Sequence, residues 1–157
     1  MSTVLFRNHF QIAYVARDAE AAMAWFRDRY GVAKWHVMDM SGQGSGARFI
    51  CLAYAGEVML EIIEPAPGVP SIYESWLAPD QLLRHHHHGF WAHSAEELRQ
   101  IRERFEANGV AIPSAARFGD VLEFLYADTV AELGHYYEVI HMLPGGKDFF
   151  TPVPRNG

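Results

Sequence analysis

The feature of this sequence that most constrains its fold is an internal repeat. Four pairs of landmark residues recur at separations of 76, 76, 78 and 77 positions: Asp18 with Ser94, Gln11 with His87, Gly31 with Gly109, and Glu61 with Glu138. A copy of this length is too small to bury one face of its own sheet. We therefore expect two similar modules that pair their sheets around a shared cleft.

Each copy has the pattern of a strand, a helix and three further strands. The expected strands of the first copy are 8–16, 33–40, 47–55 and 58–64, and its helix over 19–30 lies between the cap Asp18 and Gly31. The expected strands of the second copy are 85–93, 112–118, 121–127 and 135–143, and its helix over 95–107 lies between Ser94 and Gly109. The predicted fold class is therefore α+β, with two βαβββ modules.

We expect one globular unit, 1–157, that contains both copies. Residues 65–84 contain four prolines and little periodicity, which is typical of a linker or a lid between the modules 8–64 and 85–143. The tail 144–157 is rich in glycine and proline, so we expect it to be irregular.

Composition narrows the class of protein. Half of the residues are hydrophobic and 13% are aromatic, which is enough for a sizeable core. A net charge of -6 without a basic cluster disfavours a nucleic-acid or anionic-membrane partner. The chain has no long apolar run, and its start has no signal-peptide pattern, so we expect a cytoplasmic protein. Cys51 is the only cysteine, which excludes an internal disulfide and a multi-thiolate metal site.

Glu61 and Glu138 fit their surroundings least well. Each lies in a strongly apolar strand, VMLEIIEP and HYYEVIHM respectively, where an uncompensated carboxylate is costly to bury. A divalent cation would compensate both charges. The first strands of the two copies present Gln11 and His87 at equivalent positions, so the candidate metal ligands are Gln11, Glu61, His87 and Glu138. This nitrogen and oxygen donor set suits Zn, Mn, Fe, Co or Ni.

The run of four histidines leaves alternatives within the ligand set. In a strand, His85 and His87 share one face, while His86 and His88 share the other. His9 and His85 have the same strand parity as Gln11 and His87, so either can replace the neighbouring ligand or line the cleft. A lone Glu or His in a strand is more often a solvated or satisfied residue than a ligand. The joint occurrence of four candidates at repeat-equivalent positions is what favours the metal site.

Aromatic residues supply candidates for an apolar substrate pocket. Trp35, Phe49, Trp91 and Tyr136 are the candidates, although core packing is the default role for each. The glycines of GQGSG lie between two expected strands rather than before a helix, which indicates a mobile loop instead of a phosphate-binding loop.

Four segments resemble the vicinal oxygen chelate superfamily, which contains glyoxalase I, methylmalonyl-CoA epimerase, extradiol dioxygenases and resistance proteins. They are QIAYVARDAEAAMAWFRDRYGV, VMLEIIEP, HHGFWAHSAEEL and GHYYEVI. In that family a ligand opens the first strand of each module seven residues before the helix cap, which implies Gln11 and His87. The fourth strands bring Glu61 and Glu138. This set is more similar to that of glyoxalase I than to that of the epimerase, which has Gln at the place of Glu61.

The resemblance implies a metal-dependent lyase or isomerase that acts through an enolate-like intermediate on a small carbonyl or thioester substrate. Glu138, and secondarily Glu61, would be the base. Val15 replaces the arginine that glyoxalase I uses for glutathione, which argues against that co-substrate. Two alternatives stay open: a non-catalytic binding protein of the resistance type, and an Fe(II) dioxygenase in which His9 or His85 completes the site. The family also implies a homodimer.

Overall fold

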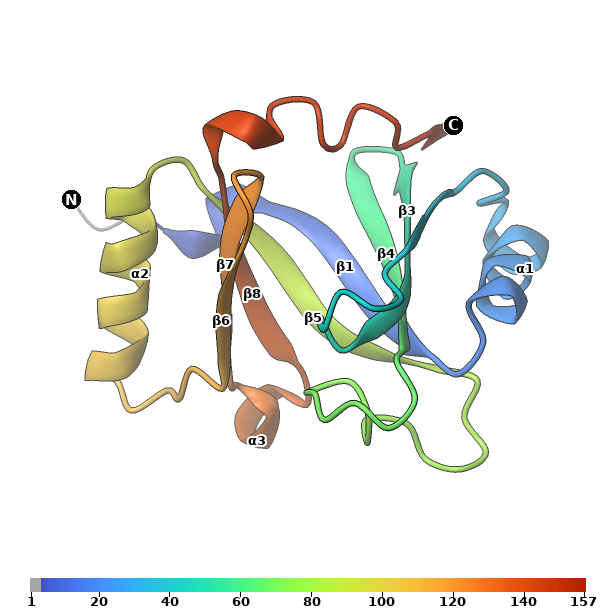
Figure 1. Ribbon diagram of the computed structural model, residues 1–157, viewed down its shortest axis with the longest axis horizontal. Coiled ribbons are helices and arrows are strands. Elements are labelled where there is room, and N and C mark those ends of the chain that lie inside the picture. The colour runs from blue at the N-terminus through green and yellow to red at the C-terminus, as the bar shows by residue number, and fades with distance from the viewer. Residues whose placement is uncertain (1–3) are drawn as a thin grey trace. The chain divides into compact units, whose positions relative to one another are not determined.

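The computed structural model describes residues 4–157 and contains the expected alternation of strands and helices (Figure 1). Its elements in chain order are η1 (Leu5–Asn8), β1 (His9–Ala16), α1 (Ala19–Tyr30), β2 (His36–Asp39), β3 (Ala47–Ala55), β4 (Val58–Pro65), β5 (Leu83–Ala92), α2 (Ala95–Ala107), β6 (Ser114–Phe118), β7 (Leu122–Ala127), α3 (Val130–Leu133), β8 (Tyr136–Met142), η2 (Pro144–Gly146) and β9 (Arg155–Asn156). Within the described residues, no helix is long and apolar enough to span a bilayer.

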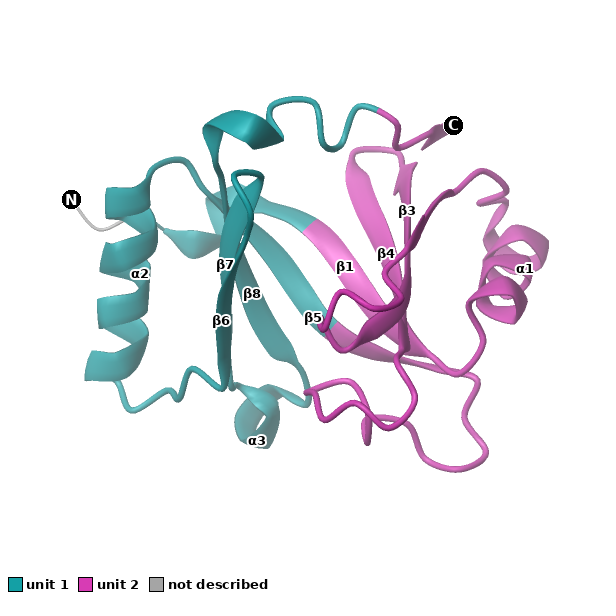
Figure 2. Cartoon of the chain, in the orientation of Figure 1, with its two compact units in different colours: residues 1–10, 87–151 teal, residues 11–86, 152–157 magenta. Residues whose placement is uncertain are grey.

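The chain divides into two compact units, which are coloured separately in Figure 2. Unit 1 comprises residues 1–10 and 87–151, and unit 2 comprises residues 11–86 and 152–157. The division therefore falls inside β1 and inside β5, so each of these strands contributes residues to both units.

The sheet of unit 2 is mixed. β1 pairs with β4 in parallel, β4 pairs with β3 and β3 with β2 in antiparallel fashion, and the short β9 adds to β3 in parallel. Helix α1 covers one face, where Ala22 and Phe26 pack with Cys51, Ala53 and Ile62 in a buried apolar cluster. The other face carries the alternate residues of each strand, and among them is Glu61.

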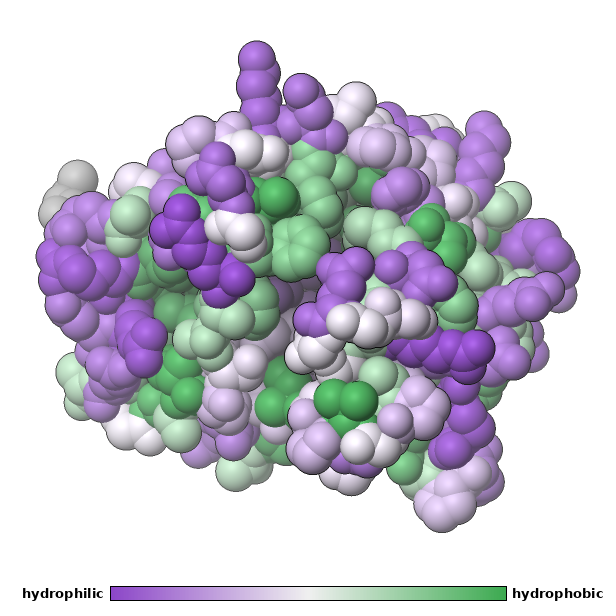
Figure 3. Space-filling view, viewed as in Figure 1, coloured by the Kyte–Doolittle hydropathy of each residue, from purple (hydrophilic) through white to green (hydrophobic). Residues whose placement is uncertain are grey.

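The sheet of unit 1 repeats this plan. β5 pairs with β8 in parallel, and β8 pairs with β7 and β7 with β6 in antiparallel fashion. Helix α2 packs through Ile101 against Ala92, Leu125 and Val139 on one face. The outward side of α2 carries Glu–Arg ion pairs and is hydrophilic at the left of Figure 3. Together the two units confirm the predicted α+β class.

Both long helices begin and end where the sequence predicts. The Asp18 side chain accepts a hydrogen bond from the backbone N–H of Ala21, and the Ser94 side chain accepts one from Glu97. Gly31 ends α1 in the left-handed conformation with a φ of 71°, which suits a residue without a Cβ.

Segments that the sequence leaves irregular are held by specific contacts. Within unit 2, the indole N–H of Trp76 donates to the carbonyl of His85 at 2.9 Å, and the guanidinium of Arg84 lies over the Trp76 ring. Arg17 donates to the carbonyls of Ala78 and Gln81. These contacts attach the proline-rich segment to the strands beside it. The end of the tail forms β9 rather than irregular structure.

Candidate metal centre

In unit 1, β5 and β8 bring His87 and Glu138 into direct contact. The parallel register places Glu138 opposite Gly89, two residues after His87, so both side chains lie on the same face. His87 Nε2 lies 3.1 Å from Glu138 Oε2, and the imidazole is fully buried while the carboxylate is nearly so. Burial strengthens the interaction between these groups because little water screens it.

In unit 2, β1 and β4 hold Gln11 and Glu61 in the same relationship. Glu61 lies opposite Ala13, again two residues after the first-strand candidate, so Gln11 and Glu61 share a face. The amide nitrogen of Gln11, which is buried, donates to the sulfur of Met59 at 3.5 Å. The oxygen Oε1 is therefore the atom of Gln11 suited to bind a cation.

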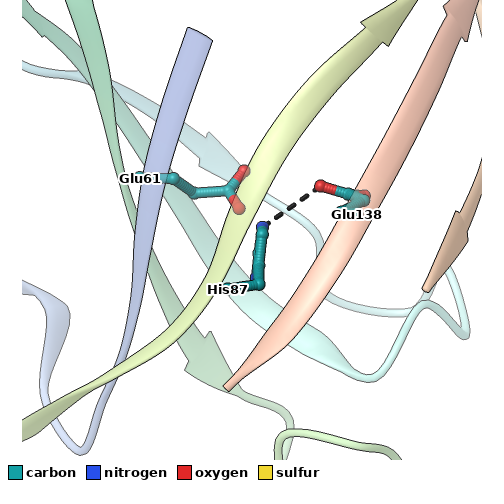
Figure 4. A group of neighbouring side chains, drawn as sticks. All are labelled: Glu61, His87 and Glu138. Atoms are coloured by element: carbon teal, nitrogen blue, oxygen red, sulfur yellow. Dashed lines mark ion pairs between the residues drawn. The ribbon is translucent and has the colours of Figure 1, made fainter. Parts of the chain in front are cut away.

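Glu61, His87 and Glu138 form one group of potential metal ligands (Figure 4). Each offers one ligand atom, and these atoms lie within 4.8 Å of one another. In Figure 4 the imidazole of His87 faces the carboxylate of Glu138. Two carboxylates and one imidazole are the donors that first-row divalent cations prefer, and a cation would offset the repulsion between the two acidic groups. The residues present therefore fit a divalent metal.

Tyr126 packs beside His87 in this group, and no motif in the sequence singles it out. It lies on β7 opposite Glu138 and is almost fully buried. Its ring meets His87 edge-on, with ring centroids 5.1 Å apart and an interplanar angle of 87°. This packing limits rotation of the imidazole. The sequence pattern indicates only that Tyr126 and Phe124 lie on the same face of one strand, which does not distinguish a residue beside the site from a core residue.

The four aromatic residues that were predicted to line a substrate pocket separate into two pairs by location. The first pair is Tyr136 and Trp91, which lie in unit 1. Tyr136 lies 6.2 Å from the ring of Tyr126, and burial raises the pKa of its phenol, with a smaller contribution from Asp128. Trp91 stacks on Phe10 with ring centroids 3.9 Å apart.

Trp35 and Phe49 pack on the helix side of the unit 2 sheet instead. Both contact the apolar cluster beneath α1. Phe49 has the same strand parity as Cys51, whereas Leu52 is the residue that lies opposite Glu61. The structure therefore does not bring Trp35 or Phe49 to the face that carries Glu61.

The two alternative ligands also lie elsewhere. His9 Nε2 and His88 Nδ1 are 2.9 Å apart, and His88 faces away from His87 by strand alternation. The ring of His85 lies 5.9 Å from that of Tyr14, whose phenol contacts the cluster beneath α1. Neither His9 nor His85 belongs to the group formed by Glu61, His87 and Glu138.

Solved structures with a similar fold include several methylmalonyl-CoA epimerases. A variant of the Streptomyces coelicolor enzyme in complex with 2-nitronate-propionyl-CoA has a TM-score of 0.64 at 18% identity, covering 86% of this chain and 96% of that one. The Mycobacterium tuberculosis enzyme has a TM-score of 0.65 at 13% identity, covering 92% and 94%. A further epimerase complex, with methylmalonyl-CoA and NH4+, has a TM-score of 0.63 at 19% identity, covering 86% and 94%. At these identities the likeness establishes the fold alone.

Sequence comparison gives the family directly. Curated protein sequences show no significant match to this chain. A family model described as the glyoxalase/bleomycin resistance protein/dioxygenase superfamily matches residues 10–124. This range is most of the chain, and it runs from the second residue of β1 through α1 and β5. The repeated βαβββ plan, the shared fold and this match agree, and the chain belongs to the glyoxalase/bleomycin resistance protein/dioxygenase superfamily.

Proposed function

We propose that this protein is a divalent-metal-dependent isomerase or lyase that acts on a small carbonyl or thioester substrate through an enolate-like intermediate. The observation that carries the proposal is the convergence of Glu61, His87 and Glu138, whose ligand atoms lie within 4.8 Å of one another. Gln11 would add its amide oxygen as a fourth donor. A bound divalent metal would supply Lewis-acid stabilisation of the oxyanion that develops on the substrate.

The proposed base is Glu138. Its Oε2 lies 3.1 Å from His87 Nε2, and we assign the transferred proton to its second oxygen, Oε1. Glu61 is the second candidate base. Two carboxylates from different strands would allow one to remove a proton from the substrate and the other to return it, which is what inversion at a carbon requires.

The substrate class is proposed from the structural neighbours. Two of the epimerase structures contain acyl-CoA ligands, which are thioesters, and in one of these ligands, methylmalonyl-CoA, the carbon next to the thioester carbonyl carries an acidic proton. An acidic C–H next to a thioester carbonyl is the bond that a buried carboxylate base can break, because the resulting negative charge moves onto the oxygen. We propose methylmalonyl-CoA as the first substrate to test.

The donor set favours this proposal over an Fe(II) dioxygenase. A dioxygenase site of the common type uses two histidines and one carboxylate. The group here has one histidine and two carboxylates, and His9 and His85 contact His88 and Tyr14 instead. The cytoplasmic location and the homodimer stay predictions.

The test measures proton exchange at the substrate carbon. Metal-depleted protein is reconstituted separately with Zn²⁺, Ni²⁺, Co²⁺, Mn²⁺ or Fe²⁺ and incubated with methylmalonyl-CoA in D₂O, and deuterium incorporation is followed by mass spectrometry. We expect incorporation with at least one metal, and its loss in Glu138→Gln. Metal content is measured in the same samples.

Glu123→Gln is the matched control. Glu123 lies on β7, and its Oε1 is bonded to His141 Nδ1 at 2.8 Å, so the variant also removes a partly buried carboxylate in contact with a histidine. We expect normal metal content and exchange in this variant. Unchanged metal content in the double variant Glu61→Gln/Glu138→Gln would overturn the site assignment, whatever the substrate.

A further inference from the structure

Three histidines gather on the other face of the unit 1 sheet, away from His87. His9 from β1 and His88 from β5 approach each other with His9 Nε2 and His88 Nδ1 2.9 Å apart. His135, just before β8, places its ring 4.9 Å from that of His88, measured between centroids. All three are partly accessible to solvent. They form what we call the histidine triplet.

The triplet is separate from the group of Glu61, His87 and Glu138. His87 and His88 are successive residues of a strand, so their side chains leave opposite faces of the sheet. The parallel register places His88 opposite Tyr137 and His87 opposite Tyr136, which extends the same division to β8. A ligand held by the triplet would therefore lie across the sheet from Glu138.

The spacing of the two closest nitrogens suits a metal ion. Imidazole nitrogens bind first-row metals at about 2.0–2.1 Å, so two adjacent ligands at a right angle are about 2.9 Å apart, and at the tetrahedral angle about 3.3 Å. His9 Nε2 and His88 Nδ1 are 2.9 Å apart. Modest rotations of the two rings would turn both lone pairs toward a common point, where a metal would replace the proton shared between them. Among first-row divalent ions, the affinity for nitrogen donors rises through Ni²⁺ to a maximum at Cu²⁺.

His135 has the hydrogen bond that is typical of a ligating histidine. Its Nδ1 lies 3.1 Å from the carbonyl oxygen of Leu133, and that oxygen accepts the Nδ1 proton. In this tautomer the lone pair is on Nε2. To bring Nε2 toward the other two nitrogens, the His135 side chain would have to rotate and exchange its bond to Leu133 for the metal.

Aromatic rings lie beside the triplet. Tyr137 lies 5.3 Å from His135 and 6.3 Å from His88, and Phe90 lies 5.4 Å from His9. Phe6 meets both Phe90 and Tyr137 edge-on. An apolar border around nitrogen donors limits competition from water and strengthens metal binding.

We propose that His9 and His88, with His135 as the third donor, bind a first-row divalent ion of the nickel or copper type at a second metal site. This site is distinct from the proposed catalytic group, because His88 leaves the opposite face of β5 from His87.

The test is the stoichiometry of Ni²⁺. Purified protein is dialysed to equilibrium against Ni²⁺, and the bound metal is measured by mass spectrometry for the wild type, His88→Gln, His9→Gln and Glu138→Gln. We expect two ions per chain in the wild type and one in each of the three variants. A single ion in the wild type that persists in both His88→Gln and His9→Gln would overturn the second site.

The two proposals fail in different ways. A single ion that is lost in His88→Gln but kept in Glu138→Gln supports the second site and overturns the first. His135→Gln should weaken the second ion by about 10-fold or more, as the loss of one of three donors predicts. Electron paramagnetic resonance with Cu²⁺ should show nitrogen coupling that is lost in His9→Gln.

His93→Gln is the control variant. It removes a histidine that follows the same strand, β5, but does not belong to the triplet. His93 is exposed and follows β5, so we expect two ions in this variant. Thermal melting without metal shows whether each variant is folded. A folded His9→Gln protein that still binds two ions would contradict the proposal directly.

Discussion

The two halves of the molecule use one backbone arrangement for two different sets of side chains. In both, the fourth strand places a carboxylate opposite the residue two positions after the first-strand candidate: Glu61 opposite Ala13, and Glu138 opposite Gly89. The first-strand residue differs, however. It is Gln11 in one half, bonded to a methionine sulfur, and His87 in the other, 3.1 Å from the carboxylate.

This difference indicates that the two halves contribute unequally to the proposed site. The second half supplies an imidazole, a nearly buried carboxylate and the ring of Tyr126 packed edge-on against His87. The first half supplies a neutral amide and a carboxylate that is more accessible, and at the position of Tyr126 it has Leu52 opposite Glu61. We therefore expect the second half to dominate both metal binding and catalysis.

The largest expected effect is the loss of exchange activity when either carboxylate is replaced, and this loss should differ between Glu138 and Glu61. Glu138→Gln should reduce the rate of deuterium incorporation by about 10³-fold, since loss of a general base typically costs 10² to 10⁴. Glu61→Gln should cost about 10²-fold or less, because the remaining base is the more rigidly held one. The measurement is exchange at saturating metal, which separates the loss of the base from the loss of metal. Equal losses in the two variants would contradict the unequal roles.

The second effect concerns metal affinity. His87→Ala should weaken binding at this site by more than about 100-fold, because outer partners alone are worth 10- to 100-fold and His87 is a direct donor. Gln11→Ala should weaken it by about 10-fold, since an amide oxygen is a neutral and weaker ligand. Competition with a calibrated chelator gives both affinities, and His93→Gln is again the control. A larger loss in Gln11→Ala would reverse the ranking of the halves.

Much of the fold follows from local signals in the sequence. The helix caps Asp18 and Ser94, the stop at Gly31, and the alternation of the strands depend on neighbouring residues, so they are visible without tertiary information. The repeat spacing also pointed to Glu61 and Glu138, because a carboxylate in an apolar strand is an anomaly at any level of structure.

The remaining features depend on contacts between distant residues. The pairing of β9 with β3 is supported by hydrogen bonds between the side chain of Asn156 and the backbone of Lys34 and Tyr54. No local sequence pattern predicts this pairing. Trp35 and Phe49 were pocket candidates because aromatic residues serve both cores and pockets. The approach of His9 to His88 depends on the relative placement of β1 and β5, which strand parity alone does not give.

The third effect compares Cys51 with Leu125. These residues are counterparts, since Cys51 lies opposite Ile62 and Leu125 lies opposite Val139, and both are buried beneath a helix. Burial raises the pKa of the Cys51 thiol to about 12, with smaller contributions from Glu64 and Glu61. The folded state therefore favours the neutral thiol, and this contribution to stability is complete below the unfolded pKa and is lost as pH rises from about 9 toward 12.

By pH 10 the unfolded thiol is mostly ionised, which should remove about 1.4 kcal/mol of the stability of the wild type relative to Cys51→Ala. Urea unfolding at pH 7 and pH 10 measures this difference. Leu125→Ala should cost about 2–5 kcal/mol at both pH values, because leucine does not titrate. A pH-independent cost of Cys51→Ala would show that the thiol is not protected in the folded state.

The smallest effect compares the two helix caps. Asp18→Ala and Ser94→Ala should each lower the free energy of unfolding by about 1 kcal/mol, since each removes an acceptor for a backbone N–H in the first turn. The costs should differ in their response to salt. The Asp18 carboxylate also interacts with the positive end of the helix dipole, so its cost should fall by a few tenths of a kcal/mol at about 1 M NaCl, whereas that of the neutral Ser94 should stay constant. Urea unfolding at low and high salt measures both, and identical salt responses would mean that the charge of Asp18 contributes nothing beyond its hydrogen bond.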